Sequence, residues 1–392
     1  MNLLRRHPIA MALVALLLVT AIHPLPPLVD PATGTPPGEV ELVRPTLYVV
    51  LAPLSDTLDA LTFLSLERAR WALAVWALAL AAWGALHPGP ARLRAGRGLL
   101  GPIGLVLLGG AAVLLPRPVP RLAAADSAVT ILDYHAHTEA SHDGRPGWTY
   151  ARLAAWHARQ GFEASYVTDH NVIFYLPVNE PIRLLPGVEW SVYRQHVVAL
   201  GPVQPIARDS FSASTPRMLR LFGEVERQGA LGIASLPEYW RNHVEDLDAF
   251  VDAGADGFEI VNCAPKALGF PSSVRRAVVA LAARYDLVVV GASDNHGWGQ
   301  VTCVWNVSQP GTHGYRANRI LARPLALLQG EWRPWAAPVT QPWFMLRSLS
   351  WGERVSWLTW VLVILLYRAM PRRRGQPAGI GILARSLGPR EV

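Results

Sequence analysis

Four apolar segments set the first constraint on how this 392-residue chain can fold. Two of them lack charged residues over long stretches, residues 71–86 for sixteen positions and residues 99–115 for seventeen. A helix that crosses a bilayer needs about 20 mostly apolar residues, and inside lipid every backbone polar group must be paired within the protein. We therefore predict membrane-spanning helices over residues 66–86 and 98–115.

The other two apolar segments lie near the chain ends. Residues 9–24 follow two arginines, and the sequence HPLPP stands where a signal peptide would carry small residues for cleavage, so we predict an uncleaved anchor. Residues 355–370 precede three arginines, which favours a fourth spanning helix over a helix lying in the interface. Residues 1–124 are thus predicted to be a membrane region with about three spanning helices. Residues 313–392 are predicted to form a linker, the fourth helix and a basic tail.

The arginines predict the orientation of these helices. If all four segments span, the arginines at positions 5–6, 92–97 and 372–374 lie on one side, which the positive-inside rule makes cytoplasmic. The loop over residues 25–62 has five acidic residues and one arginine, as suits the outer side. We therefore predict a multi-pass membrane protein in which residues 125–312 are extracytoplasmic.

Charge and cysteine content restrict the function of that central block. Residues 125–312 carry 20 acidic and 14 basic residues, a net charge of −6, and the rest of the chain carries 9 acidic and 22 basic residues, a net charge of +13. Because an acidic domain repels a phosphate backbone, we expect no nucleic-acid partner. Two cysteines are too few for a disulfide framework or a cysteine zinc module. We expect Cys263 and Cys303 to be small buried residues and not a functional pair.

The central block alternates strand and helix patterns. Short β-branched runs occur at 129–132, 164–168, 187–190, 196–200, 230–234, 257–261 and 287–292, and helical patterns at 148–160, 215–228 and 272–285. This alternation predicts an α/β domain with a mainly parallel sheet, open or closed into a barrel.

Histidines and carboxylates follow several of these runs at the point where each strand ends. His135 and His137 follow the first run, Glu189 ends the third, and Asp294 and His296 follow the last. The carboxyl ends of parallel strands meet on one face, so these residues should converge. The two imidazoles of HAH share one face of an extended strand. Imidazole and carboxylate ligands without thiolate suit zinc, manganese or iron, and a carboxylate such as Glu189 can bridge two ions.

Five motifs in order resemble the polymerase and histidinol phosphatase (PHP) superfamily of metal-dependent phosphoesterases. They are HAHTEASHDG, TDHN, PGVE, QHVVALG and SDNHG, spread over about 165 residues and absent from the apolar segments. The resemblance implies a distorted seven-stranded (β/α)7 barrel flanked by the transmembrane helices, with two and up to three divalent ions. The implied metal ligands are His135, His137, Asp143, His170, Glu189, His196, Asp294 and His296.

The chain departs from the family pattern at one expected ligand. The family has a histidine before a proline after the next strand, whereas this chain has Leu236 before Pro237. Glu238 or His243 are the alternatives that could replace that ligand. His142 is an additional histidine that could protonate a leaving group, and the alternative is a solvent-facing residue.

Other residues are candidates for binding or support. Arg145 could hold a substrate phosphate by bidentate hydrogen bonds, and the alternative is an ordinary surface arginine. Lys266 could play the same part, and Asn262 could orient it. Asp169 is expected to support a ligand histidine and not to bind metal.

The resemblance implies a membrane-tethered phosphatase or phosphodiesterase that uses metal-activated water. Glu189, Asp294, Arg145 and His142 are its candidate catalytic residues. Its expected substrate is a phosphorylated small molecule, a lipid or a cell-envelope component. Two alternatives stay open: a metal-binding sensor module without turnover, motivated by the missing histidine, and a metal-dependent hydrolase of a non-phosphate bond.

Overall fold

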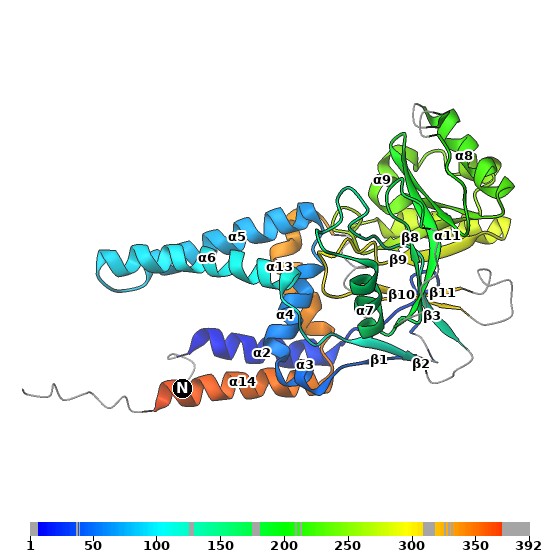
Figure 1. Cartoon of the computed structure of the whole chain (residues 1–392). Coiled ribbons are helices and arrows are strands. Elements are labelled where there is room, and N and C mark those ends of the chain that lie inside the picture. Colours follow the sequence, from blue (N-terminus) through cyan, green and yellow to red (C-terminus); the bar gives the residue numbers. More distant parts are fainter. Residues whose placement is uncertain are drawn as a thin grey trace, which may run out of the picture.

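The structure is a computed structural model that describes residues 7–370 apart from positions 37, 39, 125–128, 175–180, 208–209, 212–213, 309–317, 325–326, 328–329 and 331. The predicted basic tail and the first two arginines lie outside the described residues. Figure 1 shows long helices at one end of the molecule and the sheet with its surrounding helices at the other. Long helices from the first 114 residues and from the part of the chain after residue 350 therefore lie in one region, although they are far apart in the sequence.

Two helices are long and apolar enough to cross a membrane, α5 (Leu66–Leu86) and α6 (Ala91–Leu114). Their surfaces are mostly exposed and apolar: 11% of the most apolar stretch of α5 and 6% of that of α6 are buried inside the protein. The N-terminal helix α2 (Pro8–Ile22) is apolar but has only 15 residues. Helix α6 begins before the predicted residue 98, because the arginine-rich stretch after Pro90 is also helical.

The C-terminal apolar segment is a bent pair of helices. Residues Pro334–Arg347 comprise η3 (Pro334–Ala336) and α13 (Ala337–Arg347). The chain bends by 113° between them and α14 (Trp351–Ala369). A capping box of Ser350 and Glu353 begins α14. The buried guanidinium of Arg354 donates to the backbone oxygens of Leu17 and Thr20 at 3.0 and 3.2 Å, which ties α14 to α2.

Short elements connect the helical region to the sheet. They are β1 (Val40–Val43), α3 (Thr46–Val50), α4 (Ala52–Thr62) and β2 (Arg121–Ala124), and β1 pairs with β2. Asp59 of α4 accepts from Arg117 at 3.0 Å and from Arg323 at 2.8 Å. The hydroxyl of Tyr48 donates to the same carboxylate at 2.9 Å. Because Asp59 is 1% exposed, this network anchors the helices to the sheet through buried, paired charges.

Nine strands form one nearly closed, barrel-like sheet in the order β11-β10-β3-β4-β5-β6-β7-β8-β9. Their bounds are β3 Thr130–Asp133, β4 Ala164–Val167, β5 Arg183–Val192, β6 Gln195–Leu200, β7 Leu231–Ser235, β8 Gly257–Asn262, β9 Val288–Ala292, β10 Val304–Ser308 and β11 Arg319–Ala322. The described sheet thus extends past position 312, since β11 pairs with β10.

The predicted seven-stranded, mainly parallel barrel is corrected in two respects. Strands β10 and β11 were not predicted, and the pairs β5–β6, β6–β7, β3–β10 and β10–β11 are antiparallel. The turn between β5 and β6 consists of residues 193–194. Two residues permit a hairpin, whereas a parallel crossover needs a dozen or more. The parallel pairs that remain, β3–β4, β4–β5, β7–β8 and β8–β9, carry the predicted strand ends.

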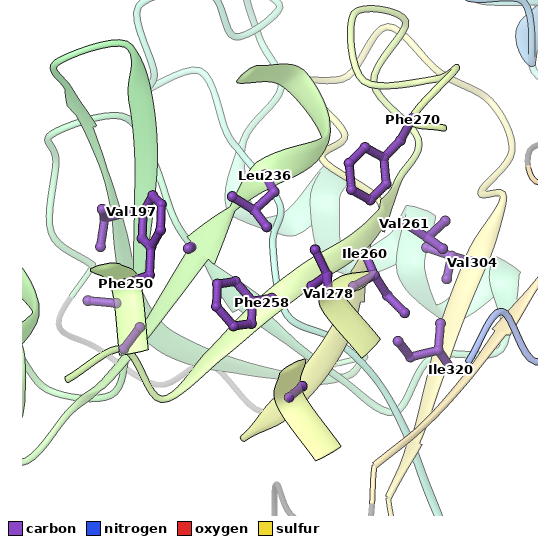
Figure 2. Packing of buried hydrophobic residues seen from close by; sticks show 14 of the residues in the cluster. Val197, Leu236, Phe250, Phe258, Ile260, Val261, Phe270, Val278, Val304 and Ile320 are labelled. Atoms are coloured by element: carbon purple, nitrogen blue, oxygen red, sulfur yellow. The ribbon is translucent and has the colours of Figure 1, made fainter. Parts of the chain in front are cut away.

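Helices cover the outer surface of the sheet. They are α7 (Tyr150–Gln160), α8 (Thr215–Arg227), α9 (Leu236–His243), α10 (Asp248–Asp252) and α11 (Ser272–Tyr285). Helix α7 ends at Gly161, whose φ of 89° is favourable only for glycine. Figure 2 shows the largest apolar cluster, in which Leu236 lies close to Phe258 of β8.

The two cysteines form a disulfide, which corrects the prediction that they are not a functional pair. Cys263 follows β8 and Cys303 precedes β10, and their Cα atoms are 5.6 Å apart. Forty positions separate them in the sequence, so local patterns could not relate them. The bond joins the loops that follow β8 and β9.

We predict that removing this bond destabilises the barrel. A loop of this length should lose about 2–4 kcal/mol of stability in Cys263→Ser/Cys303→Ser, because the unfolded chain regains the entropy that the bond removes. The apparent Tm in detergent should fall by roughly 5–15 °C. Reductant should lower the Tm of the natural protein and leave the variant unchanged; equal melting of both proteins without reductant would contradict this prediction.

Candidate metal centre

Two histidines and two carboxylates direct their ligand atoms at one centre. Nε2 of His135 lies 2.9 Å from Nε2 of His137 and 3.0 Å from Oε2 of Glu189. Oδ1 of Asp294 lies 3.6 Å from the first imidazole nitrogen and 3.0 Å from the second. Nε2 of His137 is 3.2 Å from Oε2 of Glu189. We call these four side chains the four-residue cage, and each is at most 9% exposed.

The cage fits a divalent ion. Four ligands at about 2.0–2.2 Å from an ion lie roughly 3.3–3.6 Å apart at tetrahedral corners, and the observed separations of 2.9–3.6 Å approach that range. Neither carboxylate oxygen of Glu189 makes a well-aligned hydrogen bond to any described residue, despite these short separations. The atoms therefore converge on a shared centre.

Neighbouring side chains hold the cage histidines in this orientation. Oε1 of Glu259, on β8, lies 3.2 Å from Nδ1 of His135, and Oγ of Ser141 lies 3.2 Å from Nδ1 of His137. Such partners leave the opposite nitrogen of each ring directed at the centre of the cage, where it could bind an ion. Glu259 was not among the predicted site residues. The sequence feature that could have identified Glu259 is that it is the single carboxylate within the apolar run GFEIV.

Glu189 also belongs to a second group of ligand atoms. Its Oε1 lies 2.6 Å from Nδ1 of His196, and its Oε2 lies 3.1 Å from Nδ1 of His170. Oγ of Ser191 lies 3.1 Å from the same nitrogen of His170. One carboxylate therefore faces both groups, as a ligand shared by two ions must.

Leu236 contributes no ligand to this second group. Its side chain is 1% exposed and lies in the apolar cluster. The hydroxyl of Tyr239, on the same helix, lies 3.5 Å from Nε2 of His196. Tyr239 was not among the predicted site residues, because no motif includes it.

Neither predicted replacement for that ligand joins the described ligand groups. His243 lies 3.0 Å from the backbone oxygen of Arg194 through its Nε2, and Glu238 is paired with Lys266 at 3.3 Å. Neither residue is part of the described ligand groups.

A third group lies at the opening of the site. Oδ1 of Asp143 is 3.2 Å from Nε2 of His296, and Oδ2 is 3.6 Å from Nε2 of His170. The Asp143 side chain is 43% exposed and that of His142 is 73% exposed. An ion held here would have fewer buried ligands than one in the cage.

The charges at the site favour bound cations. Burial lowers the pKa of His135, but the charges of Glu189, Asp294 and Glu259 outweigh it and raise that pKa well above its usual value. Burial would raise the pKa of Glu189, yet His135 and His196 hold it well below its usual value. Burial alone would lower the pKa of His296, but the carboxylates of Asp143 and Asp294 outweigh it and raise that pKa to about 9. The buried carboxylates thus require positive charge, which protons or metal ions can supply.

Backbone contacts position the ligand-bearing loops. Asp294 has a φ of 45°, uncommon for a residue other than glycine, and its N–H donates to the His135 oxygen at 2.9 Å. Asn262 donates to the Asp294 carboxylate at 3.0 Å. A Cβ on Gly144 would lie 2.0 Å from the Thr138 oxygen, so the Asp-Gly step of the first motif requires glycine.

The other candidates take different positions. Arg145 lies beside the opening, where its backbone N–H donates to the His296 oxygen at 2.9 Å and its Nη1 to the Gly297 oxygen at 3.3 Å. Asn262 orients Asp294 and not the predicted Lys266, which pairs with Glu238. Asp169 accepts from the N–H and hydroxyl of Thr138 at 2.6 and 2.8 Å, so its partner is a loop residue and not a histidine.

This fold and site define a mixed α/β domain whose histidine, aspartate and glutamate cluster could hold metal. The sequence matches no protein-family model and no curated protein. Among solved structures, the chain is similar to a putative metal-dependent phosphoesterase from Bifidobacterium adolescentis, with 18% identity, coverage of 43% of this chain and 88% of that one, and a TM-score of 0.33. It is similar to PsfC from Pseudomonas syringae, with 17% identity, coverage of 55% and 98%, and a TM-score of 0.38.

A third similar structure is a lesion-specific endonuclease Q from Pyrococcus furiosus, with 11% identity, coverage of 48% of this chain and 54% of that one, and a TM-score of 0.34. Endonuclease Q also occurs among the similar structures in complex with a 27-mer duplex bearing an abasic lesion. This finding contradicts the prediction of no nucleic-acid partner. That prediction used the net charge of the whole block, whereas bound cations and nearby arginines determine the local charge at a metal site.

We predict that the purified protein binds divalent metal through the cage. His135→Ala/His137→Ala should lose about one equivalent of metal or more, because two of roughly four ligands of one ion are removed. Elemental analysis after metal-supplemented expression measures this loss.

His243→Gln is the matched control, because His243 is a buried histidine that joins none of the described ligand groups. It should keep the metal content of the natural protein. Equal metal content in the double variant, or less than half an equivalent in the natural protein, would refute the cage.

Proposed function

We propose that this protein is a membrane-tethered, metal-dependent phosphoester hydrolase of the PHP type. The observation that carries the proposal is the four-residue cage, which shares Glu189 with the group of His170 and His196. Two imidazoles and two carboxylates whose ligand atoms all lie within 4.8 Å of one another form a donor set suited to zinc, manganese or iron. We propose His135, His137, Glu189 and Asp294 as ligands of one ion, His170, Glu189 and His196 of a second, and Asp143, His170 and His296 of a third, weaker one.

Bound divalent ions would supply Lewis acidity for a phosphoryl oxygen and lower the pKa of a water molecule. The chain's own residues complete the site around them. Arg145 presents a cation at the opening that can bind a phosphate oxygen. His142, exposed beside Asp143, is placed to give a proton to a leaving group. Burial and the nearby charge of Glu238 raise the pKa of Tyr239 well above its usual value, so its hydroxyl keeps a proton to donate beside His196.

A metal-binding module without turnover is the second candidate function. The observation in its favour is Leu236, which occupies a position where the family has a ligand and instead packs in the apolar cluster. Its second ion would then be held by His170, Glu189 and His196 alone. Activity measurements on metal-loaded protein distinguish the two candidates.

We further propose that the chain crosses the membrane several times and that the barrel is extracytoplasmic. Three observations support this. In Figure 1 the α5–α6 hairpin, α2 and α14 extend from the barrel toward the same side. Arg92, Arg94 and Arg97 lie in the first turns of α6, far from the barrel, as the positive-inside rule favours. Disulfide bonds such as Cys263–Cys303 form and persist mainly in proteins exposed to an oxidising compartment.

We predict that hydrolysis depends on the cage carboxylates. Glu189→Gln and Asp294→Asn each remove one negative ligand with little change in size, and each should reduce kcat/KM by at least about 100-fold. The assay uses p-nitrophenyl phosphate and bis(p-nitrophenyl) phosphate with metal-loaded protein.

Glu245→Gln, an exposed carboxylate on the same domain, is the control and should keep full activity. Metal-loaded natural protein that hydrolyses neither ester would refute phosphoesterase activity and support the binding module. Unchanged activity in both cage variants would place catalysis elsewhere.

Labelling of introduced cysteines can test the topology. Both natural cysteines are in the disulfide, so an introduced cysteine is the one reactive thiol. In intact cells a membrane-impermeant maleimide should label Arg227→Cys, whose native side chain is 71% exposed, and should leave Arg92→Cys unlabelled. Both variants should react after lysis, and the reverse pattern in intact cells would place the barrel in the cytoplasm.

A further inference from the structure

We propose that the substrate is a phosphoester carried by a membrane-embedded amphiphile, which enters the site from the bilayer surface. This inference rests on the proposed function and adds to it the class of substrate. Its basis is the direction in which the site opens. Two loops that carry site residues also contact the ends of the two helices that can span the membrane.

The loop after β9 is the first of these connections. It contains Asp294 and His296, and four residues later the amide of Gln300 donates to the Val113 oxygen at 3.0 Å. Val113 is one residue from the end of α6, where Leu114 and Leu115 are 47% and 48% exposed. Four residues span at most about 14 Å, so His296 lies close to the apolar end of a candidate spanning helix.

The loop after β8 is the second connection. Asn262 contacts the cage carboxylate of Asp294 at 3.0 Å, and three residues later the Pro265 oxygen accepts from the N–H of Leu66 at 3.0 Å. Leu66 is the first residue of α5. Three residues span at most about 11 Å. Since both loops lie at strand ends, the face of the barrel that carries the ligands is turned toward the helical region.

The opening itself carries groups suited to a bilayer surface. Trp298 lies midway between His296 and Gln300, is 46% exposed, and donates through its indole to the Asp143 oxygen at 3.3 Å. The guanidinium of Arg145 lies 5.8 Å from its ring centroid. Exposed tryptophans favour the membrane–water interface, and arginine favours the phosphates found there.

With the end of α6 at the edge of the hydrocarbon core, these positions fall at the depth of lipid phosphates. The polar layer on each side of the hydrocarbon core is roughly 5–7 Å thick, and Trp298 is two residues, at most about 7 Å, from the residue that contacts α6. A phosphoester on a lipid headgroup can therefore meet Arg145 and the cage while its acyl chains stay in the bilayer. A water-soluble substrate would need no such placement.

The test compares the rate on a long-chain phospholipid with the rate on a short-chain phospholipid that has the same headgroup. The full-length protein in nonionic detergent micelles is assayed on dioleoyl phosphatidic acid and dioleoyl phosphatidylglycerol, each beside its dibutanoyl analogue, which stays monomeric. The rate on the long-chain ester should exceed that on its analogue by about tenfold, and it should fall as detergent dilutes the substrate in the micelle.

Variants at Trp298 sharpen the comparison. Trp298→Gln should lower the ratio of long-chain to short-chain rates by about fivefold, because an interfacial aromatic group is lost, and Trp298→Phe should largely keep it. Metal content measured on each variant verifies that the site is intact. An unchanged ratio in Trp298→Gln with full metal would remove Trp298 from the proposal.

Three further outcomes would overturn the inference. Equal rates on long and short chains, with p-nitrophenyl esters also hydrolysed, would refute the amphiphile and leave the proposed function standing. Faster cleavage of an abasic duplex oligonucleotide than of either lipid would assign the site to nucleic acid. Hydrolysis of no phosphoester at all would refute both the inference and the proposed function.

Discussion

The buried carboxylate of Glu189 is the constraint around which the site is arranged. One of its oxygens faces His135 and His137, and the other faces His196. An anion that is 1% exposed is costly unless positive charge is close to both oxygens. The loops after β3 and β4 and the first residues of β6 place four imidazoles around Glu189. The buried carboxylates still require cations as partners. A site with this composition could hold a metal ion.

The junction between helices and barrel gives that site its surroundings. Asp59 holds Arg117 and Arg323 together in a buried network, and the loops that follow β8 and β9 meet the ends of α5 and α6. The Cys263–Cys303 bond joins these same two loops. The barrel is therefore fixed against the helical region on its ligand-bearing face, which limits the direction from which a substrate can approach.

Leu236 stands where the motif that the sequence resembles has a histidine, so the second ligand group differs from that motif. A leucine there adds to the apolar cluster around Phe258, and a neutral tyrosine hydroxyl from the next turn stands at the edge of His196. A hydroxyl can donate to a substrate oxygen, whereas an imidazole ligand would be occupied by metal. In the proposed mechanism the site therefore has a hydrogen-bond donor, the Tyr239 hydroxyl, and lacks the metal ligand that a histidine at position 236 would supply.

The sequence by itself determined the strand ends that carry ligands, because period-two apolar runs followed by His135, Glu189 or Asp294 are local patterns. It also determined the two long apolar helices, since their length and lack of charge are properties of single segments. The tertiary structure decided which atoms meet, including Glu259 behind His135, and it decided the antiparallel strands, the disulfide and the direction of the opening. Those features depend on contacts between residues dozens to hundreds of positions apart, and no local pattern encodes such distances.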